Sequence, residues 1–151
     1  MRVEDLLGED PGDVARHLAD AAHSAGADAW MRRLATELDR LSERDAFTRW
    51  LDVWGISDAE AGRLFGVSRQ AIAKWRAKGV PEERLTTVGD LAAITDLLTS
   101  YVRRDRIRVV VRRPAEVLGG RSMIDLVGAG RTAELLAVTR HMFDLRRLDA
   151  A

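Results

Sequence analysis

The sequence contains no cysteine and only three histidines among its 151 residues. Disulfide bonds and thiolate metal sites are therefore excluded. His17, His23 and His141 also lack the i, i+4 spacing that two metal ligands on one helix would need. No apolar run approaches the ~20 residues of a membrane-spanning helix, and the N-terminus has no apolar signal core. We therefore expect a soluble, cytoplasmic protein without a metal site.

Signatures of catalysis are also missing. No serine lies in a nucleophile elbow, and no pair of carboxylates has a recognisable catalytic context. Gly128, Gly130 and Ala133 match the dinucleotide fingerprint G-x-G-x-x-A, which works only when it follows a strand. The preceding residues IDLV are predicted to be helical instead, so we expect neither enzymatic activity nor a cofactor.

The formal net charge is zero, but the charges are unevenly distributed along the chain. Residues 1–60 carry a net charge of −7, and residues 61–151 carry +7. This asymmetry predicts an acidic partner for the second part. It also allows the acidic N-terminal part to pack against a basic surface.

Residues 57–75, SDAEAGRLFGVSRQAIAKW, have the pattern of two short helices joined by a tight turn. Ser57 or Asp58 can cap the first helix, and Ser68 can cap the second. Gly66 stands where a left-handed turn residue is favoured. A glycine inside a helix costs about 1 kcal/mol relative to alanine, so Gly62 indicates a close helix–helix approach. The residues expected to pack between the helices are Ala61, Leu64, Phe65, Ile72 and Trp75. This pattern resembles the DNA-binding helix-turn-helix of the Xre class of bacterial regulators.

In a helix-turn-helix, the first residues of the second helix meet base edges in the major groove of double-stranded DNA. Arginine can pair with guanine, glutamine with adenine, and an alanine methyl can contact thymine. Residues 63–78 hold five basic side chains and no acidic one, which is the charge pattern of a nucleic-acid reader. The predicted DNA-contacting residues are Ser68, Arg69, Gln70, Ala71, Lys74, Arg76 and Lys78.

We predict an all-α protein with three regions. Residues 1–45 should form amphipathic helices, one with a stripe through Val14, Leu18 and Ala21 or Ala22, the next through Trp30, Leu34, Leu38 and Leu41. The second stripe favours dimerisation or packing on the chain's own body. Residues 46–104 should hold the helix-turn-helix, a preceding helix with Phe47, Trp50, Leu51 and Trp54 in the core, and a long helix from about Pro81 to Tyr101–Arg104.

Residues 105–151 should form a smaller unit. The β-branched residues in 107–111 favour a short strand or an extended linker. Pro114 should open a short helix ending at Gly119–Gly120, Ser122 should cap another, and residues 131–143 should form an amphipathic helix. The arginines at 103–113 fit phosphate contacts, an acidic protein surface or the acidic N-terminal helices, with phosphate contacts favoured.

Residues 112–143 also resemble the C-terminal toxin-binding domain of Xre/MbcA/ParS antitoxins. That domain has a proline, a leucine–glycine turn, a capped helix containing Asp-Leu, a glycine turn and a final helix. The matching residues are Pro114, Leu118, Gly119, Ser122, Asp125, Leu126 and Gly130. Met123 stands where a proline is common. With the helix-turn-helix, the resemblance spans residues 46–145.

This resemblance implies an antitoxin that neutralises a RES-domain toxin, an NAD-consuming protein, and whose complex with the toxin binds its own promoter. A homo-oligomer is expected. The residues that the resemblance assigns to toxin binding, or places near the toxin, are Pro114, Leu118, Ser122, Asp125, Leu126, Arg131, Arg146 and Arg147. The alternative is a stand-alone helix-turn-helix regulator that uses the C-terminal unit for oligomerisation.

Overall fold

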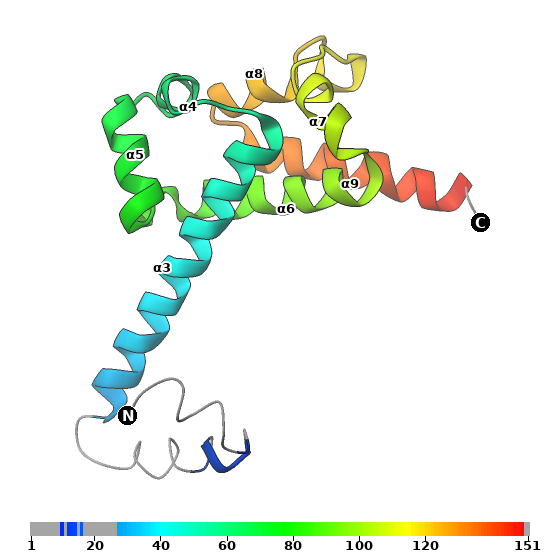
Figure 1. Cartoon of the computed structure of the whole chain (residues 1–151). Coiled ribbons are helices and arrows are strands. Elements are labelled where there is room, and N and C mark those ends of the chain that lie inside the picture. The colour runs from blue at the N-terminus through cyan, green and yellow to red at the C-terminus, as the bar shows by residue number, and fades with distance from the viewer. Residues whose placement is uncertain (1–9, 11, 15, 17–26, 150–151) are drawn as a thin grey trace. The chain divides into compact units, whose positions relative to one another are not determined.

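The computed structural model describes residues 10, 12–14, 16 and 27–149. In this part of the chain the fold is all-α, which confirms the predicted fold class, and the only extended pairing is an isolated bridge between Ala115 and Arg121. The described elements are α3 (Ala27–Trp54), α4 (Asp58–Phe65), α5 (Arg69–Lys78), the 3₁₀ helix η1 (Glu82–Arg84), α6 (Leu85–Tyr101), α7 (Arg104–Val110), the 3₁₀ helix η2 (Glu116–Leu118), α8 (Met123–Gly128) and α9 (Thr132–Asp149) (Figure 1).

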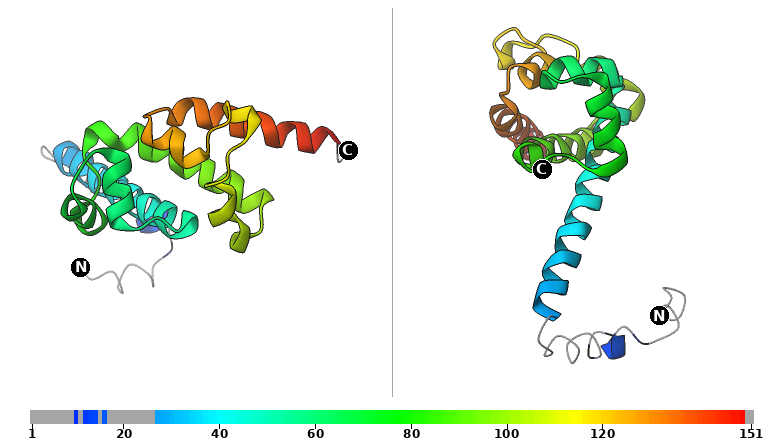
Figure 2. Two further views of the ribbon diagram at one scale, coloured as in Figure 1. Left: turned by 90° about the horizontal axis from the view of Figure 1, so that it is seen from above. Right: turned by 90° about the vertical axis from the view of Figure 1, so that its left-hand side faces the viewer.

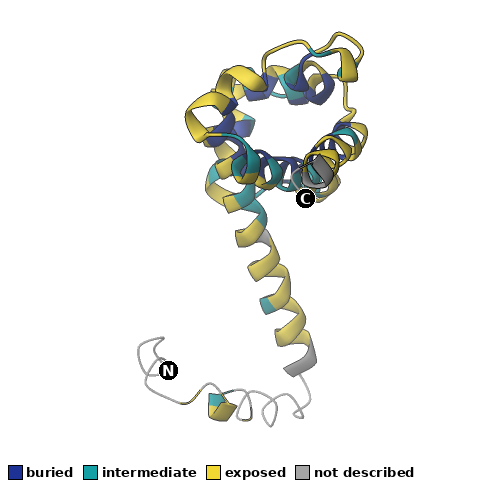
Figure 3. Cartoon of the chain, turned by 90° about the vertical axis from the view of Figure 1, so that its right-hand side faces the viewer, coloured by how far each residue is buried: buried dark blue, intermediate teal, exposed yellow. Residues whose placement is uncertain are grey.

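The chain divides into two compact units, one ending at Asp39 and the other beginning at Arg40. In the first unit, the helix predicted through Trp30 is confirmed as the beginning of α3. Trp30 and Leu38 are exposed, as is Leu41 at the start of the second unit (Figure 3). Of the apolar stripe predicted to begin at Val14, the residues Leu18, Ala21 and Ala22 lie outside the described residues.

The core of the second unit is built around the last turns of α3. Phe47, Trp50 and Trp54 are completely buried. Phe47 packs edge-on against Phe65 of α4 and Trp75 of α5, with ring centroids 6.1 and 5.7 Å apart. Trp75 is itself buried, as predicted. Aromatic side chains bury large apolar areas and favour such edge-on contacts, so this cluster joins α3 to both helices of the predicted motif.

Helices α6 and α9 lie side by side and close the other part of the core (Figure 2). Ile94 of α6 and Leu135 of α9 are completely buried, and Tyr101 and Phe143 stack with ring centroids 4.6 Å apart. The buried residues of these helices belong to the same cluster as those of α3, α4 and α5. The described helices from Arg40 onward therefore share one core. The domain limits predicted at 45/46 and 104/105 stay predictions about which residues carry which function.

Two local predictions for the C-terminal residues were wrong. Residues 107–111 were expected to be a strand or a linker, but Ile107 lies within helix α7, and Val111 follows directly as its C-cap. Both side chains are completely buried, and their i, i+4 spacing places them on one helical face, so burial outweighs the β-propensity of the segment. The helix expected from Pro114 is only the single turn η2, which starts at Glu116.

The two buried tryptophans of α3 offer a test of this packing. Trp54 Nε1 donates a hydrogen bond to Thr95 Oγ1 at 3.0 Å, whereas Trp50 Nε1 has no hydrogen-bond partner among the described residues. Trp54→Phe should therefore lower the free energy of unfolding by at least about 1 kcal/mol more than Trp50→Phe. Urea unfolding followed by far-ultraviolet circular dichroism measures the difference. Equal losses would mean that the Trp54–Thr95 bond adds nothing to stability.

Candidate functional site

Helices α4 and α5 each begin at a serine cap, and a tight turn at Gly66 joins them. The hydroxyl of Ser57 accepts a hydrogen bond from Glu60 N at 3.2 Å, and that of Ser68 accepts one from Ala71 N at 3.1 Å, so both predicted caps are present. Gly66 ends α4 in the left-handed conformation, with φ at +67°, as its position in the sequence predicted.

Gly62 explains how closely the turn approaches α4. Val67 N donates to Gly62 O at 2.8 Å. A Cβ at position 62 would lie 2.7 Å from Val67 O, a distance at which the backbone would have to shift. The prediction of a close approach at this glycine is confirmed, although the closest neighbour is the turn backbone.

Helix α5 presents one buried side and one exposed side. Ile72 and Trp75 face the core. Four residues on the other side, Arg69, Gln70, Ala71 and Lys74, form a surface that we call the reading face; Ala71 is half-buried and the other three are exposed. Lys78, at the end of the helix, is also exposed. Among the described residues, no ion pair involves Arg69, Lys74 or Lys78.

Arg76, the remaining basic residue predicted to contact DNA, is engaged inside the protein. Its Nε lies 3.0 Å from Asp58 Oδ1, and its Nη2 lies 3.5 Å from Asp52 Oδ1. The nearer contact is an ion pair without the geometry of a hydrogen bond. These pairs connect the end of α5 to α3 and α4, so Arg76 contributes to the position of the reading face. A DNA contact by Arg76 stays a prediction.

Arg112 has a structural role that its place in an arginine run did not reveal. Its guanidinium donates to Trp54 O at 2.9 Å and to Gly55 O at 3.0 Å. It also pairs with the Glu60 carboxylate at 3.0 Å. Carbonyls at the end of a helix lack partners within it, and here a side chain 58 positions later supplies the partner. The sequence gives no sign of such a distant pair.

The predicted toxin-binding residues divide into those that support the fold and those on the surface. Ser122 caps α8 in a complete capping box with Asp125, and Leu126 is buried in the core. Leu118 is half-buried, while Pro114 is exposed. Arg131 makes two hydrogen bonds of 2.7 Å to the Glu134 carboxylate.

The end of α9 carries the last of these residues. The Arg146 guanidinium lies over the Phe143 ring, 5.9 Å from its centroid. The side chain of Arg147 lies outside the described residues. Arg146 and Arg131 are both exposed, on α9 and on the turn before it, and the Arg131 guanidinium is paired with Glu134.

Among solved structures, this chain is similar to a chain from the crystal structure of the M. tuberculosis MbcT–MbcA toxin–antitoxin complex. The sequences are 27% identical, the TM-score is 0.54, and the match covers 66% of this chain and 91% of that one. The resemblance to MbcA-type antitoxins is confirmed. No protein-family model and no curated protein matches the sequence.

The MbcA-like chain shows no sign of a metal centre or a membrane span in the part that is described. No group of three or more potential ligand side chains could hold a metal ion there. No described helix is long and apolar enough to cross a membrane.

The capping box of α8 predicts a pH-dependent contribution to stability. Hydrogen bonds from the backbone and side chain of Ser122 lower the pKa of Asp125 below its usual 3.8. A carboxyl with a lowered pKa in the folded state stabilises the fold above its unfolded pKa, and this contribution disappears as the pH falls through the folded pKa. Asp125→Asn should therefore destabilise at pH 7 and make progressively less difference below about pH 4.

Ser122→Ala removes the hydroxyl that accepts the Asp125 N–H in the same capping box. This variant should lower the free energy of unfolding by about 1 kcal/mol at pH 7. Thermal unfolding of both variants and the wild type between pH 3 and pH 7 measures these effects. A destabilisation by Asp125→Asn that stays constant over this range would contradict a role of the ionised carboxylate.

Proposed function

We propose that this chain is a DNA-binding antitoxin that neutralises a RES-type, NAD-consuming toxin and represses its own operon. The observation that carries the proposal is the similarity to a chain of a toxin–antitoxin complex over two-thirds of the sequence. The toxin class follows from the resemblance of residues 112–143 to the toxin-binding domain of these antitoxins.

Binding to DNA is supported by the geometry of α4 and α5. The turn fixed by Gly66 and Ser68 holds α5 with its reading face exposed. Arg69 and Gln70 stand at the N-terminal end of α5, where side chains of a recognition helix reach base edges. Lys74 and Lys78 continue the positive charge along the helix, and such charge supplies the sequence-independent part of DNA affinity.

A homo-oligomer is part of the proposal. Helix-turn-helix proteins bind two half-sites as symmetric dimers, and a group of large apolar residues exposed on one helix favours a protein–protein contact. In the first unit, Trp30 and Leu38 of α3 are 54% and 57% exposed. We assign this part of α3 to contact with a second copy.

The toxin contact is assigned to the surface of the C-terminal residues. Arg131 and Arg146 are the exposed members of the predicted set. Ser122, Asp125 and Leu126 act indirectly, because they hold α8 in place.

One observation is equally compatible with the alternative of a stand-alone regulator that oligomerises through its C-terminal helices. Val109, Val117 and Leu145 are exposed by 64%, 53% and 48%, and a second copy of the chain could cover them as well as a toxin could. The two functions differ in whether the adjacent gene of the operon encodes a toxin that this chain neutralises.

DNA reading is tested at the reading face. Arg69→Ala and Gln70→Ala should each cost about 1–3 kcal/mol of specific binding and relax base preference. Lys74→Ala should weaken specific and non-specific binding alike, because a phosphate contact is independent of sequence. Arg140→Ala, at an exposed position of α9, is the charge-matched control. Fluorescence anisotropy with the promoter DNA and a scrambled duplex gives the affinities; unchanged affinity of the Arg69/Gln70 double variant would exclude α5 as the reader.

Toxin neutralisation is tested in cells that express the adjacent gene. Truncation after Arg113 is unsuitable, since it removes Leu126, Leu135 and Phe143 from the shared core. The full chain should restore growth and the NAD level, and the Arg69→Ala/Gln70→Ala variant should do so equally well while losing promoter binding. Two outcomes would contradict the antitoxin function: expression of the adjacent gene alone does not harm the cells, or the full chain does not protect them. The stand-alone regulator would then be the better description of the function.

A further inference from the structure

A pocket of about 360 Å³ opens where the end of α6 meets α7, α8 and α9. Tyr101 and Phe143 form one wall as a stacked pair, with their planes only 11° apart. Met123, at the start of α8, and Leu98 contribute buried apolar surface. The volume is near the lower end of the range of about 300–1,000 Å³ that is typical of ligand pockets.

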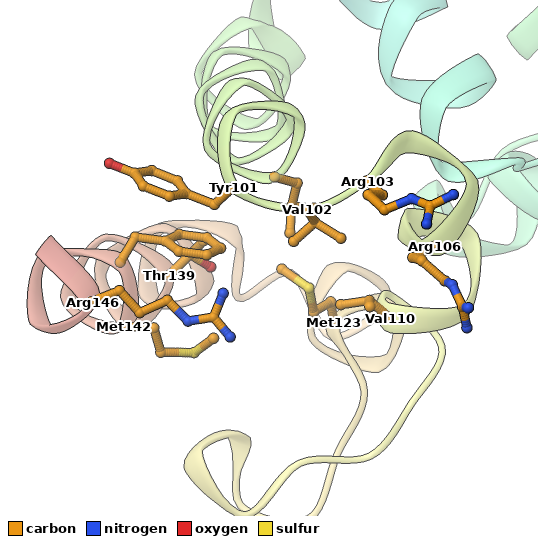
Figure 4. A pocket seen from close by; sticks show the side chains of 11 residues that line it. Tyr101, Val102, Arg103, Arg106, Val110, Met123, Thr139, Met142 and Arg146 are labelled. Atoms are coloured by element: carbon orange, nitrogen blue, oxygen red, sulfur yellow. The ribbon is translucent and has the colours of Figure 1, made fainter. Parts of the chain in front are cut away.

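Basic side chains line this apolar pocket. Arg103 and Arg106 lie beside Val110, and Arg146 reaches in from α9 (Figure 4). Asp105 lies 3.2 Å from Arg103 and 3.9 Å from Arg106. One carboxylate is therefore shared between two guanidiniums and can neutralise only one of the two positive charges. Arg146 contacts the ring of Phe143. The pocket lining therefore holds three positive charges and no acidic side chain.

The chemistry of the walls favours a protein side chain over a polar small molecule. Apart from the arginines, the polar side-chain groups of the lining are the hydroxyls of Tyr101 and Thr139, and Thr139 Oγ1 already donates to Leu135 O at 2.7 Å. Ligand pockets for polar molecules use a few placed polar groups to fix orientation. Nucleic-acid phosphates would use the arginines but would leave the apolar interior uncovered.

We propose that this pocket receives an apolar side chain of leucine size, carried by an acidic segment of a partner protein. The apolar side chain would occupy part of the space between the Tyr101–Phe143 pair and Met123, and the flanking carboxylates would pair with Arg103, Arg106 and Arg146. Methionine side chains adapt their shape to what they contact, and Met123 and Met142 both line the pocket. The identity of this partner as the toxin rests on the proposed function.

The four methionines of the chain provide the readout. In protein labelled with ¹³C at the methionine methyl groups, Met123 and Met142 report on the pocket, and Met31 on α3 is the internal control. The probe is the capped peptide Glu-Glu-Leu-Glu-Glu, titrated into the full chain. Two control peptides replace the leucine by alanine or every glutamate by lysine.

The acidic leucine peptide should shift the Met123 and Met142 signals and leave Met31 unchanged. Both control peptides should bind at least about tenfold more weakly. The Arg103→Ala/Arg106→Ala/Arg146→Ala variant should weaken the acidic peptide about tenfold, whereas Arg140→Ala should not. Circular dichroism verifies that the variants are folded. Equal shifts with all three peptides, or none at millimolar peptide, would overturn the proposal.

The same triple variant separates this inference from the proposed function. If the pocket receives the toxin, the variant should protect cells at least tenfold less well than the wild type when the adjacent gene is induced. Full protection by the variant would exclude the pocket as the toxin contact and leave the antitoxin function standing. Failure of the wild type to protect would overturn the antitoxin function, and the peptide titration would still decide whether the pocket binds acidic apolar segments.

Discussion

The last turns of α3 make the contacts on which the rest of the second unit depends. Phe47 packs against Phe65 and Trp75, which sets the distance of α4 and α5 from the core. Trp54 donates its indole N–H to Thr95 and so connects α3 to α6. Breaking a buried hydrogen bond or removing a large core side chain costs several times more than changing a surface residue. The reading face therefore has a fixed position because of residues that never touch its surface.

Local patterns in the sequence predicted much of this architecture. Ser57, Ser68 and Ser122 were identified as caps because short polar side chains precede apolar helical stripes, and all three accept the expected hydrogen bond. Gly66 was identified by the need for a left-handed residue between two helices, and Trp75 by its place on an apolar face. These features depend on residues only a few positions apart, which a single sequence displays directly.

Contacts between distant residues could not be predicted in this way. Arg112 and Glu60 are 52 positions apart, and in the sequence Arg112 is one of several similar arginines. Arg76 stands beside residues predicted to read DNA, yet its partners Asp52 and Asp58 hold it against the protein. Helix α7 was missed for a related reason, because Ile107 becomes helical through burial in a core that the segment's own propensity does not reveal. The pocket beside Arg146 likewise requires four helices to meet.

Helix α4 connects the two surfaces to which function is assigned. On one side the turn that leads to α5 packs against Gly62 of α4, where no Cβ would fit without movement of the backbone. On the other it meets α8, where a Cβ at Gly128 would lie 3.2 Å from Leu64 Cδ2. Its residue Glu60 also holds Arg112, just beyond α7. Since close-packed interiors have low compressibility and transmit strain, the packing of α8 against Leu64 and the Glu60–Arg112 pair help to fix the position of α4, and with it the orientation of the reading face.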